Sequence, residues 1–216
     1  MSQASFSSIG SENHWTAADL VAHWGPIPLH RICMNPGPGS ATEEDLIRMH
    51  DHDNRLFELV DATLVEKDMG TYESYLAIRI AFYLGVYLEQ RPLGIVLGEA
   101  GFMRFRPGLV RAPDVSFISN ERLHKIQLKS QPIASLVPDL AVEVISKGNT
   151  TIEMERKLFE YFERDVAMVW YIYPNTKSAI AYTSPIDFEH ISSSGVLHGG
   201  CVLPDFELRL DRLFEV

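Results

Sequence analysis

Three charged side chains have types and spacing that suit metal-assisted chemistry. Glu143 is a lone carboxylate in the apolar, β-branched run DLAVEVIS at 139–146, which is typical of a buried strand. Asp114 opens a similar run, DVSFIS, and Lys157 follows Glu143 on a predicted helix. An ionised side chain that leaves water must be paired or must bind a metal, because burial otherwise costs several kcal/mol. Two strand-borne acids and a nearby lysine therefore suggest metal-assisted cleavage of a phosphodiester.

Each of these residues also has a purely structural interpretation. Asp114 follows Pro113 and could serve as a turn or cap residue. Glu143 could form a structural ion pair with an arginine. Glu153 precedes Lys157 by four residues, the favourable order for a helical ion pair. The two side chains could therefore form an ion pair on a solvent-exposed helix face. Alternatively, Glu153 could orient Lys157 toward a scissile phosphate.

Other polar residues are weaker candidates. Glu58, in the run FELV, could complete an acidic cluster or pair with an arginine such as Arg55. Lys147 competes with the helical lysine, but the following Gly-Asn predicts a turn that leaves Lys147 in solvent. The stretch HDHDN at 50–54 is better explained as a helix-end loop than as a metal site. HExxH, CxxC, P-loop, GxGxxG and GxSxG patterns are absent from the sequence.

Composition sets limits on the class of protein. The 216 residues are most simply one globular domain, with 46% apolar and 22% charged residues. A net charge of −10 argues against a protein that coats nucleic acid. It does not exclude a nuclease, because bound divalent cations reverse the local field where carboxylates converge. DNA binding would then need a local basic strip, for which the candidates are Arg104, Arg106, Arg111, Lys125 and Lys129.

The sequence also predicts a compartment. No apolar run approaches the roughly 18 residues of a membrane span, and the polar start lacks a signal-peptide core. Two cysteines, Cys33 and Cys201, provide neither a disulfide framework nor a zinc site. We therefore expect a cytoplasmic protein without a membrane partner.

Two parts are expected along the chain. Residues 1–40 form a polar segment, of which the first 14 residues are expected to be disordered, and a proline- and glycine-rich arm. Residues 41–216 form the body, where helical and strand patterns alternate. Together these patterns predict an α/β (α+β-like) fold with a mixed central sheet flanked by helices.

The individual elements follow from periodicity and from turn signals. The helix at 71–90 is expected to bury the face formed by Tyr75, Ile78, Phe82 and Val86, which share helical spacing. Residues 55–66 predict a hairpin that turns near Asp61-Ala62. The other helices are expected near 16–23, 42–50 and 151–164, and the other strands near 94–99, 101–106, 113–118, 139–146, 167–174 and 177–183, with a strand pair after 188.

From about residue 42 to 216 the chain resembles the Uma2 family of restriction-endonuclease-like proteins, within the PD-(D/E)XK nuclease superfamily. The resemblance depends on the order and spacing of several segments. These are FELVD at 57–61, the long helix, APDV at 112–115, PDLAVEVIS at 138–146, Lys157 with Tyr161, VWYIYP at 169–174 and LPDFEL at 203–208.

The resemblance implies a restriction-endonuclease-like core and assigns roles to its residues. Asp114 and Glu143 become the two metal-binding acids, and Glu58 matches the family's N-terminal acid. Lys157 stands for the superfamily's lysine, moved to the following helix, because the usual position two after the glutamate holds Ile145.

The chain departs from the family pattern at several positions. Glu153 stands where an aspartate is common, and Ala62 replaces the usual glycine of the hairpin turn. Residues 147–150 replace a Pro-Ser-Thr-like continuation, and the first turns of the long helix, at 72–75, lack a histidine that many members carry. None of these departures removes an expected metal ligand.

The implied activity is that of a divalent-metal-dependent endonuclease acting on DNA. Asp114, Glu143 and the main-chain carbonyl of Val144 would hold Mg²⁺, with Mn²⁺ as a substitute. Lys157 would position the attacking water or neutralise charge on the phosphate. A homodimer is expected from the same resemblance. The alternatives are a catalytically inactive nuclease-fold protein that binds nucleic acid or acts as a scaffold, and a phosphodiesterase acting on a small nucleotide.

Overall fold

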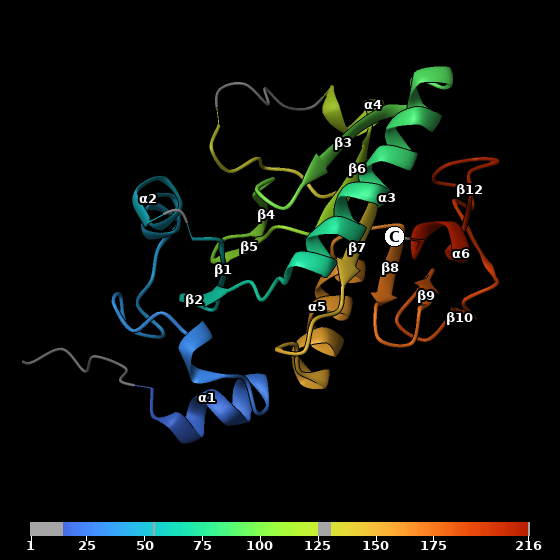
Figure 1. Cartoon of the computed structure of the whole chain (residues 1–216). Coiled ribbons are helices and arrows are strands. Elements are labelled where there is room, and N and C mark those ends of the chain that lie inside the picture. Colours follow the sequence, from blue (N-terminus) through green and yellow to red (C-terminus); the bar gives the residue numbers. More distant parts are fainter. Residues whose placement is uncertain (1–14, 54, 125–130, 216) are drawn as a thin grey trace, which may run out of the picture.

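The centre of the molecule is a mixed sheet of six strands, shown in Figure 1. The computed structural model describes residues 15–53, 55–124 and 131–215, so the expected disorder of residues 1–14 lies outside it. In sheet order the strands are β10 (Phe188–Ile191), β9 (Ser178–Tyr182), β8 (Met168–Tyr173), β7 (Leu140–Val144), β6 (Val115–Ser119) and β3 (Gly94–Gly98). Strands β7 and β8 are parallel, and every other neighbouring pair is antiparallel. The predicted mixed sheet is confirmed.

A smaller antiparallel sheet carries the predicted hairpin. Its order is β2 (Thr63–Glu66), β1 (Phe57–Val60), β5 (Leu109–Arg111) and β4 (Met103–Arg106). Asp61 and Ala62 both have positive φ, 48° and 53°, as a two-residue type I′ turn requires. The hairpin was predicted correctly, whereas β5 was not expected as a separate strand.

Two helices cover opposite faces of the central sheet. Helix α3 (Thr71–Gln90) packs on the face that carries Val142, and α5 (Thr151–Glu163) packs on the face that carries Ala141. Helix α5 also connects the parallel strands β7 and β8 as a crossover. Strand β7 is therefore central and apolar on both faces, as the sequence predicted for the strand that carries Glu143.

The buried face of α3 differs from the prediction. Ile78, Phe82 and Val86 are exposed, with 68%, 63% and 42% of their surface accessible. The residues that pack on the sheet are Leu76, Ala77, Ile80 and Leu84. Tyr75 is partly buried against the core, so the prediction was wrong for three of its four residues. The reason is that α3 is apolar around much of its circumference, so its periodicity offers two apolar stripes and does not say which one is buried.

The two stripes of α3 permit a matched test of stability. We expect Ile80→Ala to lower the free energy of unfolding by about 2–5 kcal/mol, because the buried side-chain carbons beyond Cβ are lost and a cavity remains. Ile78→Ala should change it by less than about 1 kcal/mol, because the side chain is in solvent. Urea unfolding of both variants measures the difference. Equal losses would show that something covers the outer stripe.

The N-terminal arm and the C-terminal segment complete the fold. The arm carries α1 (Ala17–Trp24), capped by Thr16, and the 3₁₀ turn η1 (Leu29–Arg31), and α2 (Glu43–Asp53) follows it. The remaining elements are α4 (Asn120–Leu123), the hairpin of β11 (Val196–His198) and β12 (Glu207–Arg209), and α6 (Leu210–Leu213). The division at residue 41 stays a prediction. Within the described residues, no helix combines the length and apolar character needed to cross a membrane.

Candidate active site

Two buried acids meet where β6 begins and β7 ends. Asp114 directly precedes β6, and the antiparallel register pairs Val115 with Val142 of β7. The main-chain N–H of Val144 donates to Asp114 Oδ2 at 2.7 Å, which fixes Asp114 beside the segment that carries Glu143. Asp114 and Glu143 are 5% and 4% exposed. The register of two strands thus brings together acids that are far apart in the sequence.

Lys157 reaches this pair from α5. Its Nζ lies 3.2 Å from Glu143 Oε1 and 3.1 Å from Glu58 Oε2, and the side chain is buried. Tyr161, one helical turn later, donates its hydroxyl to the same Glu143 oxygen. The interpretation of Lys157 as part of a solvated helix face is therefore wrong. The sequence identified Tyr161 only as part of the family resemblance, and its hydrogen bond to Glu143 was not predicted.

Glu58 joins the cluster from β1. Its Oε1 accepts a hydrogen bond from the main-chain N–H of Ala112 at 3.0 Å, and its Oε2 accepts one from Arg111 at 2.7 Å. The arginine considered from the sequence, Arg55, pairs instead with Glu66 of β2. Glu58 is consequently tied both to Lys157 and to the segment that leads into Asp114.

Lys67 is a member of the cluster that the sequence did not indicate. It follows β2 directly, and its Nζ lies 2.7 Å from Asp114 Oδ1. The same ammonium donates to the main-chain carbonyl of Ala112 at 2.5 Å. Its side chain is 7% exposed, although a lysine at the end of a hairpin usually lies in solvent. Its position directly after a buried strand is the one signal that could have revealed it.

The buried carboxylates of the cluster are paired with buried cations. Three carboxylates, Glu58, Asp114 and Glu143, face three cations, Lys67, Lys157 and Arg111. Charges taken out of water are tolerated when they are paired and hydrogen-bonded in this way. Each buried charge of the cluster therefore has at least one partner of opposite sign.

Two carboxylates that share Lys157 differ in acidity. Burial raises the pKa of Glu143 to about 7; Lys157 opposes this shift, and the negative Asp114 adds to it. Burial also opposes ionisation of Glu58, but Lys157 and Arg111 hold the pKa of that carboxyl well below its ordinary value. Burial likewise disfavours charge on Lys157, yet the two glutamates raise its pKa. Glu143 is thus the member of this group whose protonation changes near neutral pH.

Glu153 does not form the expected helical ion pair with Lys157. Its carboxylate forms a two-pronged pair with Arg31 of the arm, at 2.7 and 2.9 Å. Glu153 also caps α5 together with Thr150. Arg31 donates further to the Gly148 carbonyl at 2.7 Å, so this group fastens the arm to the start of α5. Glu153 therefore supports the helix that carries Lys157 and does not orient the lysine by direct contact.

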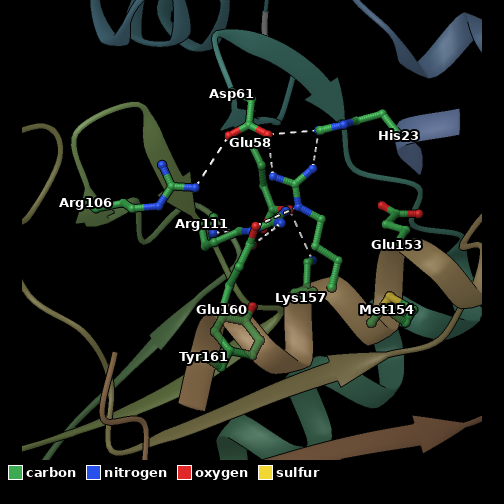
Figure 2. Close-up of polar contacts among 12 residues, drawn as sticks. His23, Glu58, Asp61, Arg106, Arg111, Glu153, Met154, Lys157, Glu160 and Tyr161 are labelled. Carbon is green, nitrogen blue, oxygen red and sulfur yellow. Dashed lines mark hydrogen bonds and ion pairs between the residues drawn. The ribbon is translucent and has the colours of Figure 1, made fainter. Parts of the chain in front are cut away.

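A chain of ion pairs connects the cluster to the surface, as Figure 2 shows. Arg111 binds Glu160 of α5, with its Nε at 2.9 Å. Glu160 also accepts from Arg156 at 2.8 Å, and Arg156 donates to Asp61 of the hairpin turn at 2.6 Å. His23 of α1 contacts the same Asp61 oxygen at 2.8 Å. The hairpin, α5 and α1 are thereby held together around Lys157.

Of the predicted basic strip, Arg104 and Arg106 are partly exposed, whereas Arg111 is not. Arg111 is buried between Glu58 and Glu160, so its assignment to a DNA-facing strip was wrong. Arg104 pairs with Glu43, and Arg106 lies 3.4 Å from Asp61. Lys125 and Lys129 lie outside the described residues. Lys147, by contrast, is exposed as predicted.

Solvent reaches Asp114 beside the start of α3. A hollow of about 440 Å³ is lined by Asp114, by α3 and by the turn at 98–101. A second hollow of about 410 Å³ is lined by Lys67, Arg55 and the first residues of α3. The two share Met69, Ser74 and Glu99 in their walls. A ligand could therefore approach both Asp114 and Lys67 from one side of the molecule.

The oxygen donors of the cluster suit a hard divalent cation. Mg²⁺ prefers carboxylate and carbonyl oxygens and keeps several waters, which fits two acids and a main-chain carbonyl. In the described part of the chain, no three His, Cys, Asp or Glu side chains gather in an arrangement that could hold a metal ion. Lys67 and the Val144 N–H already contact the two oxygens of Asp114. The donors fit the ion in kind, provided that Lys67 gives way.

Comparison of sequences decides the family. The model of the Uma2 family, described as "Putative restriction endonuclease", matches residues 43–211. The chain belongs to the Uma2 family. The matched region includes Glu58, Asp114, Glu143 and Lys157, whereas α1 and η1 precede it. A search of the curated proteins finds no match.

Comparison of structures supports the same fold. The chain is similar to a protein from Anabaena variabilis ATCC 29413 whose crystal structure is described as that of "a putative nuclease belonging to DUF820". The superposition has a TM-score of 0.65 and covers 74% of this chain and 89% of that one. The sequence identity is 15%, so the likeness concerns the fold alone. The restriction-endonuclease-like core expected from the sequence is confirmed.

Proposed function

We propose that this Uma2 protein is a Mg²⁺-dependent endonuclease that hydrolyses phosphodiester bonds in DNA, with Mn²⁺ as a substitute. The observation that supports this most is the convergence of Asp114, Glu143 and Lys157 from three elements. The Lys157 amine lies 3.2 Å from Glu143, and Asp114 is held beside Val144. Two carboxylates and an ammonium are the groups that hydrolysis of a phosphodiester uses, and Asp114 lines a hollow that is open to solvent.

Each residue then has a defined task. Asp114, Glu143 and the carbonyl of Val144 would hold the cation, which when bound would supply an activated water and offset charge on the phosphate. Lys157 would donate to the attacking water or to a phosphoryl oxygen. Glu58 keeps the Lys157 amine charged and directed toward Glu143. Tyr161 fixes the orientation of the Glu143 carboxylate.

The shape of the approach favours a polymer as the substrate. The hollows beside Asp114 and Lys67 adjoin through Met69, Ser74 and Glu99, so a polymer could contact both of them at once. An enclosed pocket would instead suit a small nucleotide. Because a cut through both strands requires two sites, we also propose that a homodimer performs it.

One observation favours the alternative of an inactive nuclease-fold protein that binds nucleic acid or acts as a scaffold. The carboxylates of the cluster already have cationic partners, since Lys67, Lys157 and Arg111 contact all three of them. Such a site has no electrostatic need for a metal ion. Activity and metal binding must therefore be measured separately.

Nicking of supercoiled plasmid tests the proposed function. The purified protein should nick plasmid in Mg²⁺ or Mn²⁺ and should be inactive in EDTA. Asp114→Asn, purified in parallel, controls for contaminating host nucleases and should be inactive. A dinucleotide hydrolysed as fast as plasmid, per bond, would point to a small-nucleotide phosphodiesterase. Absence of nicking with either metal would contradict the proposal and favour the inactive protein.

A further inference from the structure

Lys67 occupies the position in the cluster that matters most for a metal ion. Its ammonium is held by Asp114 Oδ1 at 2.7 Å and by the carbonyl of Ala112 at 2.5 Å. The other Asp114 oxygen accepts from the Val144 N–H. Both oxygens of a proposed metal ligand are thus engaged by the chain itself, one of them by a full positive charge.

The charges of the cluster make this contact a competitor for a cation. Lys67, Lys157 and Arg111 are all buried beside the three carboxylates, so a divalent ion would add two positive charges next to three cations that are already in place. Like charges repel strongly where little water screens them. Removal of the Lys67 ammonium from Asp114 relieves this repulsion and frees one carboxylate oxygen.

A hollow beside Lys67 has room for the displaced ammonium. The side chain lines the hollow of about 410 Å³ that also contacts Glu66 and Glu99. A lysine has a flexible four-carbon stem and a compact, strongly hydrated charge, so the ammonium can move without a change in the backbone. Glu66 of this hollow is already paired with Arg55, but Glu99 could partner the ammonium there, while the Val144 N–H continues to hold Asp114.

We propose that Lys67 is an exchangeable internal counter-ion, which balances Asp114 in the metal-free protein and is displaced into this hollow when a divalent cation binds. The inference rests on the proposed function, since it assumes that Asp114 is a metal ligand. It adds that the affinity of the site for metal is set by competition with a residue of the chain. Removal of the Lys67 charge should therefore tighten metal binding.

Calorimetric titration with Mn²⁺ alone tests the inference. Lys67→Met should bind Mn²⁺ roughly tenfold or more tightly than the wild type, because one buried positive charge is lost beside the ion. Lys147→Met removes a charge from an exposed lysine four residues after Glu143 and should leave the affinity unchanged. Lys67→Gln, which keeps a donor for Ala112 but no charge, should behave as Lys67→Met does. Near-ultraviolet circular dichroism verifies that each variant is folded.

Thermal unfolding provides a second readout that needs no catalysis. In EDTA, Lys67→Met should unfold at a lower temperature than the wild type, because Asp114 loses its buried partner. Mn²⁺ should raise the unfolding temperature of Lys67→Met by more than that of the wild type.

The outcomes separate this inference from the proposed function. If the wild type binds Mn²⁺ through Asp114 but both Lys67 variants bind no more tightly, the counter-ion role is overturned and the metal site stands. If the Lys67 variants bind and the wild type does not, the counter-ion role is supported in its strongest form. If no variant binds, or if Asp114→Asn binds as the wild type does, the inference and the proposed metal site both fail.

Discussion

Lys157→Met should lower the rate of metal-dependent plasmid nicking by about 10²–10³-fold, the effect of removing one charged donor from a transition state. The amine lies 3.2 Å from Glu143 and 3.1 Å from Glu58, so it is fixed before substrate arrives. Methionine keeps the apolar volume of the stem, and Glu58 retains its bonds to Arg111 and Ala112. The rate is measured at saturating Mn²⁺, so that a weaker metal site does not imitate a catalytic loss.

Tyr161→Phe is the matched control for Lys157→Met. Tyr161 contacts the same oxygen of Glu143 but carries no charge, so its loss should lower the rate by about tenfold or less. Because both groups contact the same oxygen of Glu143, their effects are coupled, and the double variant should be much less impaired than the product of the two single effects predicts. A folded Lys157→Met protein that nicks within about threefold of the wild type would show that Lys157 is structural.

The central part of the site could be predicted because it depends on local patterns. A carboxylate within an apolar strand identified Glu143, since burial of a charge requires an explanation. Lys157 follows on an amphipathic helix whose start is marked by Thr150 and Glu153 as a capping box. These features are contained within about one supersecondary unit, β7 and α5, so the sequence reveals them.

The partners of these residues could not be predicted because they come from distant parts of the chain. Lys67 meets Asp114 through the placement of the hairpin, and Glu153 finds Arg31, which lies 122 residues earlier. Charged side chains outside regular apolar runs have the same local appearance whether they end in solvent or in a buried pair. Only the three-dimensional arrangement distinguishes the two.

The surface of α3 shows a different limit. Ile78 and Ile80 are neighbours of the same type, yet one is 68% exposed and the other is fully buried. Helical periodicity identifies stripes of apolar residues, but a helix with two stripes can present either one to a sheet. The sequence therefore predicted the extent of α3 correctly and its orientation incorrectly.

Arg111→Met should lower the free energy of unfolding by about 3–5 kcal/mol at pH 7, because it leaves a buried ion network without a central cation. Arg111 is 3% exposed and donates to Glu58 at 2.7 Å and to Glu160 at 2.9 Å. Arg106→Met is the matched control, since Arg106 is partly exposed and lies 3.4 Å from Asp61. Arg106→Met should lower the free energy of unfolding by no more than about 1 kcal/mol. Urea unfolding measures both variants.

The dependence on pH shows whether the loss comes from charge. Burial opposes ionisation of Glu58 and Glu160, but the cations around them, Arg111 among them, hold the pKa of each carboxyl below its ordinary value. A lowered pKa contributes stability that is fully present above the unfolded-state pKa of about 4.3 and is lost progressively as the pH falls from there through the lower folded-state pKa. Arg111→Met lacks much of this contribution. The difference in the free energy of unfolding between the variant and the wild type should therefore become smaller below about pH 4. A gap that stays constant from pH 7 to pH 3.5 would show that Arg111 stabilises the protein by packing and not by its charge.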